Sequence, residues 1–164
     1  MVKIELDHRE ALHKVGRHCP MSFNDRHLSP GRKAHRTAQW ARIMSKCLVA
    51  SGRRHGAKWN VVGFNGKANG ESVGIVDLLA IRKDHREGRT GLKRGDAFEM
   101  VLMQIKGGSA SRPTTEDIVR LVKVAKLYRA KAVVLIEWQR KKKLKMFRLH
   151  KAQWHPVDAV AVFG

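Results

Sequence analysis

Hydrophobic residues recur at helical spacing in two stretches of the chain. In the first stretch, Ser29 and Pro30 form an N-cap followed by a proline at the first helical position, which is a strong signal for a helix start. Gly52 is expected to end this helix. Apolar positions at i, i+3, i+4, i+7 and i+8 predict one buried face. They are Trp40, Ile43, Met44, Cys47 and Leu48.

The second helical pattern begins after a loop that contains Pro113. Thr114 and Thr115 place hydroxyl groups ahead of two acidic residues, a favourable arrangement at a helix N-terminus. We expect this helix to run to about Arg129. Its predicted apolar stripe consists of Ile118, Leu121, Val122, Ala125 and Tyr128.

Between and after these helices, apolar runs predict strands. Three runs are almost continuously apolar and are typical of strands buried on both faces: 72–81 (SVGIVDLLAI), 98–106 (FEMVLMQIK) and 131–138 (KAVVLIEW). A shorter run over 59–64 ends at a turn, 144–149 is expected to return antiparallel, and 157–163 is expected to form an edge strand or a packed tail. The resulting order α-β-β-β-α-β-β predicts an α/β fold with a mixed central sheet flanked by helices.

The length and composition are those of one folded domain. The chain has 164 residues, of which 43% are hydrophobic, enough to form a core. We assign residues 29–164 to a single domain and residues 1–28, where Pro20 interrupts a short helical pattern, to a basic N-terminal arm. No apolar run is long enough to span a membrane, and the first residues form no signal peptide. We therefore expect a cytoplasmic protein with no membrane partner.

The charge predicts a polyanionic partner. The chain carries 34 Lys and Arg against 14 Asp and Glu, a net charge of +20. Residues 1–60 and 111–164 each hold 13 basic and 4 acidic side chains, whereas 61–110 holds 8 and 6. A basic periphery around a more acidic centre favours nucleic acid as the partner. The candidate phosphate contacts are Lys33, Arg36 and Arg42 on the first helix and the turn Arg140, Lys141, Lys142 and Lys143.

Three polar residues interrupt the predicted buried strands. Asp77 lies inside the 72–81 run, and Gln104 and Lys106 end the 98–106 run. Residues two apart on a strand share a face, so Gln104 and Lys106 project together. A carboxylate and an amide oxygen are ligands that suit Mg²⁺. A neighbouring ammonium can orient an attacking water or stabilise charge on a phosphoryl group.

Asp77 followed by Gln104-Ile105-Lys106 at the end of an apolar strand, and then by a helix and a strand, resembles the PD-(D/E)xK nuclease superfamily. That group includes Mrr-type restriction enzymes and Holliday junction resolvases. The resemblance covers roughly residues 34–138 and implies a restriction-endonuclease-like α-β-β-β-α-β core. It implies an endonuclease that hydrolyses DNA phosphodiester bonds with Mg²⁺ or Mn²⁺, often as a homodimer. Asp77 and Gln104 would bind the metal, and Lys106 would be the motif lysine.

The same resemblance leaves a second function open. Gln104 stands where the family has an acid, and the first helix offers only Gln39 in place of the acid often found there. Glu71 and Glu137 are the candidate auxiliary acids, and Glu99 and Asp96 are further acids that could compensate for the missing charge. The alternative is a catalytically inactive module of the nuclease fold that binds DNA or RNA. A third hypothesis is an RNA-binding subunit of a larger particle.

Overall fold

The computed structural model of the chain describes residues 27–52, 58–64, 74–85 and 91–164. Its centre is a six-stranded sheet whose strands lie side by side in chain order. The strands are β1 (Asn60–Gly63), β2 (Leu78–Lys83), β3 (Phe98–Gly107), β4 (Ala132–Trp138), β5 (Lys145–His150) and β6 (Gln153–Pro156). The helices are α2 (Pro30–Ser51), α3 (Thr115–Leu127) and the short α4 (Ala159–Phe163).

The sheet is mixed, as predicted. β3 and β4 pair in parallel, whereas every other neighbouring pair is antiparallel. Parallel neighbours need a crossover connection, and α3 provides it between β3 and β4. The sequence prediction of an α/β protein with a mixed central sheet flanked by helices is therefore confirmed.

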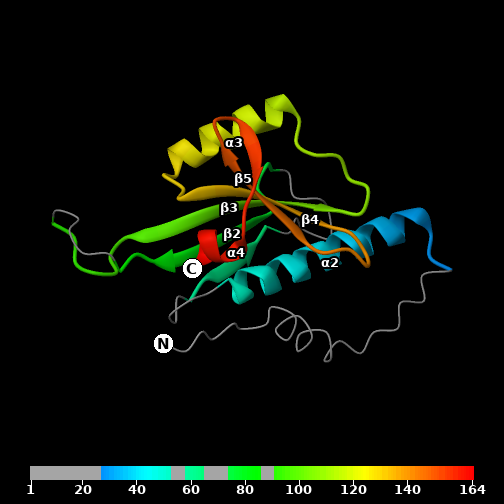
Figure 1. Cartoon of the computed structure of the whole chain (residues 1–164), viewed down its shortest axis with the longest axis horizontal. Helices are drawn as coiled ribbons and strands as arrows, with labels where there is room; N and C mark the ends of the chain where they lie inside the picture. Colours follow the sequence, from blue (N-terminus) through cyan, green and yellow to red (C-terminus); the bar gives the residue numbers. More distant parts are fainter. Residues whose placement is uncertain (1–26, 53–57, 65–73, 86–90) are drawn as a thin grey trace, which may run out of the picture.

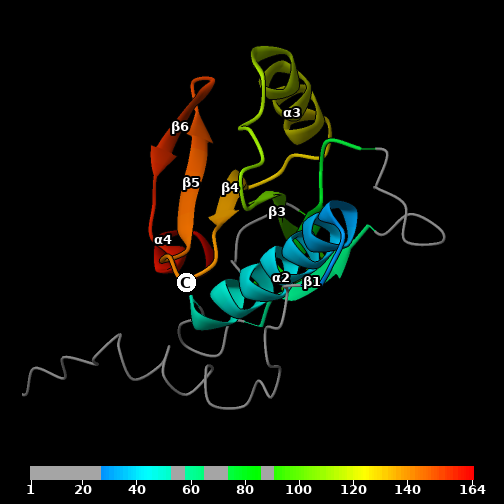
Figure 2. The same cartoon turned by 90° about the vertical axis from the view of Figure 1, so that its right-hand side faces the viewer.

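The helices cover the two faces of the sheet (Figure 1). α2 and α4 lie on one face, where Val49 and Phe163 pack against Leu78, Met103 and other residues of the strands. α3 lies on the opposite face, where Leu121 packs against Leu102 and Val133. Figure 2 shows the β5–β6 hairpin standing beside α3, with α2 crossing the sheet below. Alternate residues of each strand therefore face different helices.

The face of α2 that packs on the sheet is shifted from the predicted one, although Leu48 of the predicted stripe does pack against the core. The buried residues of the helix are Ala41, Ser45 and Val49, and Ile43 from the predicted stripe is 42% exposed. The reason is a close approach between the helix and the end of β3. A Cβ atom on Gly107 would lie 3.2 Å from atoms of both Ala41 and Thr37. Only small side chains fit in this contact, so the larger residues, including half-buried Cys47, lie to its side.

Other element boundaries agree with the sequence in part. Ser29 caps α2, and Thr114 and Asp117 form a reciprocal capping box at α3. α3 ends at Leu127, and its predicted stripe is wrong at Val122 and Tyr128, which are 44% and 56% exposed. β3, β4 and β5 lie where they were predicted to within one or two residues.

Two segments differ from the prediction. The 72–81 strand begins only at Leu78; residues 72 and 73 lie outside the described residues. The end of the chain forms the unpredicted strand β6 and then α4, which is the packed-tail alternative. Asp158 caps α4 and Phe163 is fully buried.

The proposed N-terminal arm, residues 1–28, lies outside the described residues except for its last two. No helix within the described ranges is long and apolar enough to span a membrane.

Candidate functional site

Asp77, Gln104 and Lys106 meet at one place in the structure. Gln104 and Lys106 follow Leu102 by two and four residues on β3, so they share its face of the sheet, toward α3. Asp77 directly precedes β2, where Leu78 pairs with Met103. The antiparallel register therefore brings Asp77 beside Gln104.

The Asp77 carboxylate is held by the backbone of β3. The Ile105 N–H donates a hydrogen bond of 2.7 Å to Asp77 Oδ2. A side-chain oxygen thus accepts a hydrogen bond from the β3 backbone at the residue just before β2, which begins at Leu78. The contact lies between Gln104 and Lys106 in the chain, so Asp77 and these two residues of β3 form one unit.

Burial raises the pKa of the Asp77 carboxyl above its ordinary value of 3.8. The Ile105 hydrogen bond and the charges of Arg42 and Lys106 act in the opposite direction but do not outweigh burial. Arg42 was predicted to contact phosphate from α2, and the structure brings its charge within range of Asp77. The site thus holds a half-buried acid beside two cations.

Gln104 is buried and has an unused acceptor. Its residue exposure is 5%, and its Oε1 has no hydrogen-bond donor within reach in the described part of the chain. A buried amide oxygen without a partner costs free energy, about 1–3 kcal/mol. Such an atom next to a carboxylate suits a hard cation, because Mg²⁺ and Mn²⁺ select oxygen ligands.

Glu137 lies beside Lys106 but is already engaged. It pairs in register with Lys106 across the parallel β3–β4 ladder. Arg112 holds it through two hydrogen bonds, from Nε at 2.5 Å and from Nη2 at 3.2 Å. The Arg112 guanidinium also lies over the Phe147 ring, 4.4 Å from its centroid. Arg112 was not identified from the sequence, because an arginine in a loop before Pro113 carries no signal of its own.

The remaining candidate acids do not join this site in the described residues. Glu71 lies outside the described ranges. Glu99 is at the other end of β3, bound to Arg82 at 2.6 Å and to Lys131 at 3.3 Å. Asp96 accepts from the Lys93 N–H in the loop before β3.

Two oxygen donors, Asp77 and Gln104, are therefore the described residues that fit a Mg²⁺ or Mn²⁺ ion, with one negative charge between them. Within the described ranges, no group of three His, Cys, Asp or Glu side chains is placed to hold a metal. Gln39, the substitute for a helix acid, is exposed on α2.

The predicted phosphate contacts lie at the same end of the sheet. Thr37 packs on Gly107 and Gly108 at the end of β3, which brings the N-terminal half of α2 to this edge. Gly108 N–H donates to Trp138 O at the end of β4, where the basic β4–β5 turn begins. Figure 1 shows the start of α2 and this turn at one end of the molecule. Lys33, Arg140, Lys141, Lys142 and Lys143 are exposed, and Arg36 and Arg42 are half-buried.

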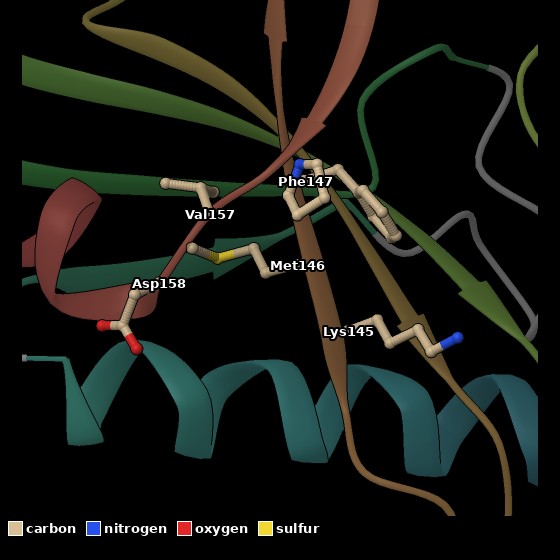
Figure 3. A pocket seen from close by; sticks show the side chains of 6 residues that line it. Lys145, Met146, Phe147, Val157 and Asp158 are labelled. Carbon is tan, nitrogen blue, oxygen red and sulfur yellow. The ribbon is translucent and has the colours of Figure 1, made fainter.

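A shallow hollow of about 580 Å³ opens between β5 and the segment that leads into α4. Figure 3 shows Lys145 and Phe147 pointing to one side of β5 and Met146 to the other, toward Val157. Lys145 pairs in register with Glu137, so Lys145 and Phe147 face the same side as the Arg112–Glu137 pair.

Comparison of the chain with protein-family models, with curated proteins and with solved structures finds no match in any of the three.

Proposed function

We propose that this protein is a metal-dependent endonuclease that hydrolyses DNA phosphodiester bonds. The observation that carries the proposal is the unit formed by Asp77, Gln104 and Lys106, in which the Ile105 N–H anchors the aspartate between the other two residues. A half-buried carboxylate, a buried amide oxygen without a donor and a lysine on one sheet face are the groups that metal-assisted phosphodiester hydrolysis needs.

The order of elements supports the same proposal. From α2 to β4 the described elements follow the sequence α-β-β-β-α-β, the order that the resemblance to the PD-(D/E)xK nucleases implies. Asp77 stands at the position of the motif aspartate, Gln104 at that of the motif acid and Lys106 at that of the motif lysine. We therefore assign the restriction-endonuclease-like core to the chain as part of the proposal.

The residues divide the chemistry between them. Asp77 and Gln104 would hold Mg²⁺ or Mn²⁺ through oxygen, and the ion would supply Lewis acidity and a more acidic water. Lys106 orients the attacking water and stabilises the negative charge that develops on the phosphoryl oxygens. The Ile105 N–H fixes the Asp77 carboxylate, so the ligand is oriented before the metal arrives. Basic residues of α2 and of the β4–β5 turn hold the DNA backbone.

A cleavage assay tests this function. Linear duplex, single-stranded and branched DNA are incubated with Mg²⁺ or Mn²⁺ and either the wild type, Lys106→Ala or the control Lys123→Ala. Lys123 is exposed on α3 and is not one of the three site residues, and its substitution removes the same charge. We expect Lys106→Ala to lower the cleavage rate by about 10²-fold or more while DNA binding persists. Equal cleavage by both variants contradicts the assignment of Lys106.

One observation favours a second candidate function, a binding module that keeps the fold without the chemistry. Among the described residues, Asp77 is the single acid at the site, because Arg112 engages Glu137. Gln104→Glu separates the two functions, since it restores the acid of the family motif. In a working site the variant binds Mn²⁺ more tightly and still cleaves DNA. If the protein is a binding module, the wild type does not cleave DNA, and its DNA affinity is the same in EDTA as in Mg²⁺.

A homodimer that cuts both strands is part of the proposal, as the resemblance implies. Sedimentation of the protein alone and with a duplex measures it. We expect two copies on each duplex, and a single copy at saturation contradicts the dimer.

A further inference from the structure

A row of charged residues crosses three neighbouring strands beside the candidate metal site. Lys106 of β3 pairs with Glu137 of β4, and Glu137 pairs with Lys145 of β5. Paired residues share a face of the sheet, and adjacent strands lie about 4.8 Å apart. Arg112 reaches this row from the loop after β3 and binds Glu137. Three cations and one carboxylate thus lie on adjacent strands and the adjoining loop, which gives a local net charge of +2.

The Arg112 guanidinium is held in place by its neighbours and is also accessible to solvent. Glu137 binds it through the Nε and Nη2 donors, and the Phe147 ring supports the flat face of the guanidinium at 4.4 Å. The Arg112 side chain is nevertheless 51% exposed. A guanidinium has N–H donors beyond the two that this fork uses. Those donors remain at an exposed surface in an orientation that the pair and the ring determine.

From this geometry we infer that Arg112, with Lys145 beside it, forms a binding site for a phosphate of the DNA backbone next to Lys106, and that Glu137 is its positioning residue. Arginine suits phosphate because its planar fork matches the phosphate oxygens, and orienting it in advance lowers the entropy that binding costs. The inference rests on the proposed function for the identity of the anion. It does not require cleavage.

This inference gives Glu137 a role different from that of an auxiliary metal ligand. A carboxylate with both oxygens bound to arginine would have to break a charged fork before it could coordinate an ion. The opposing explanation is structural: Arg112 merely ties the 108–114 loop to β4. In that case the loss of Arg112 lowers stability and leaves DNA affinity unchanged.

DNA binding in EDTA tests the inference separately from cleavage. Arg112→Ala is compared with Arg120→Ala, a matched control on α3, because Arg120 is also exposed and also pairs with an acid, Asp117, at 3.7 Å. Affinity for a labelled duplex is measured over a series of salt concentrations. We expect Arg112→Ala to bind about tenfold more weakly, with the salt slope reduced by about 1, and Arg120→Ala to change little. Equal affinities and slopes for the two variants overturn the inference.

Two further variants separate position from charge. Arg112→Lys keeps the positive charge but lacks the planar guanidinium that can donate two parallel hydrogen bonds. We therefore expect this variant to bind DNA more weakly than the wild type. Glu137→Gln adds one positive charge yet loosens Arg112, so we expect weaker DNA binding with unchanged Mn²⁺ affinity. Tighter DNA binding by Glu137→Gln, or loss of Mn²⁺ binding in this variant alone, overturns the positioning role. If the wild type cleaves no DNA but the variants still differ in this way, only the proposed nuclease function is refuted. If the wild type binds no DNA, both the nuclease function and the phosphate site are refuted.

Discussion

Asp77 and Glu99 are two acids of one sheet whose surroundings act on them in opposite ways. Burial dominates at Asp77 and raises its pKa above 3.8. Burial also opposes the charge of Glu99, but the hydrogen bond from Arg82 and the charge of Lys131 outweigh it and lower the pKa below 4.5. The ionised form therefore destabilises the fold at Asp77 and stabilises it at Glu99. The raised pKa of Asp77 therefore supports the site proposed there.

Replacement of Asp77 by asparagine is expected to stabilise the protein at neutral pH. Both states of the wild type are protonated at this position well below pH 3.8, so the cost of the charge is absent there. The cost grows as the pH rises through 3.8 and is complete above the folded-state pKa. Urea unfolding should therefore show Asp77→Asn more stable than the wild type at pH 7 and equal near pH 3. A difference that does not depend on pH contradicts this account.

Asp77→Ala is expected to behave differently from Asp77→Asn in the same experiment. Alanine leaves the Ile105 N–H without its acceptor, whereas an asparagine oxygen can still accept its hydrogen. At pH 7 the unfolding free energy of Asp77→Ala should be about 1–3 kcal/mol lower than that of Asp77→Asn. Equal stability of the two variants would show that the hydrogen bond contributes nothing.

Replacement of Glu99 by glutamine is expected to destabilise the protein at neutral pH. The stabilisation from the Glu99 charge is present above pH 4.5 and is lost as the pH falls through the lowered folded-state pKa. Glu99→Gln should cost about 2 kcal/mol at pH 7, because it removes a buried charged acceptor from Arg82 and Lys131. The difference should shrink in acid, and unfolding curves at pH 7 and pH 3 measure it.

Among the secondary-structure elements, α2 depends on a close contact with the end of β3. Ala41 and Thr37 lie so close to Gly107 that an added Cβ atom would be 3.2 Å from each, closer than ordinary van der Waals contact. The same contact brings the basic N-terminal half of α2 to the edge of the sheet where Lys106 lies. The docking of one helix thus serves both the core and the proposed DNA surface.

A methyl group at Gly107 should disturb this docking. Gly107→Ala places a Cβ atom 3.2 Å from Thr37 and Ala41, and overpacking of this kind costs about 1–3 kcal/mol. Gly31→Ala on α2 is the control, since no heavy atom lies within 4 Å of the added carbon. Thermal unfolding should show a lower Tm for Gly107→Ala alone. An unchanged Tm would mean that α2 shifts at no cost.

Over the whole molecule, the net charge of +20 dominates the expected behaviour toward DNA. Exposed basic residues of α2 and of the β4–β5 turn lie at the end of the sheet that carries Lys106. Binding to a polyanion then releases counterions, and affinity becomes steeply dependent on salt.

The salt dependence can be measured with a labelled duplex in EDTA. If about 6–10 phosphates are neutralised, affinity should fall about 10³–10⁵-fold between 50 and 200 mM salt. A nearly flat dependence contradicts a backbone-binding surface. The same titration with RNA of equal sequence tests the third hypothesis, because clearly tighter binding to RNA would favour a ribonucleoprotein subunit.

Local sequence signals were enough to predict most of the helices and strands. The Ser29 cap, the Thr114 cap and the apolar runs over 98–106 and 131–138 predicted two helix starts and two central strands. These features depend on backbone groups within a few residues, so sequence alone contains them. Asp77, Gln104 and Lys106 could be selected in the same way, because polar residues in buried strands break a local pattern.

Contacts between distant parts of the chain could not be read from the sequence. The face of α2 follows from the approach of Gly107, and the Asp77 carboxylate is held by a hydrogen bond from Ile105, 28 residues away in the chain. Arg112 and Glu137 are 25 residues apart, and only strand register and loop path bring them together. The chain pattern therefore determined which elements form and which polar residues stand out. Which side chains share a site depends on packing and register, which arise only when the elements meet.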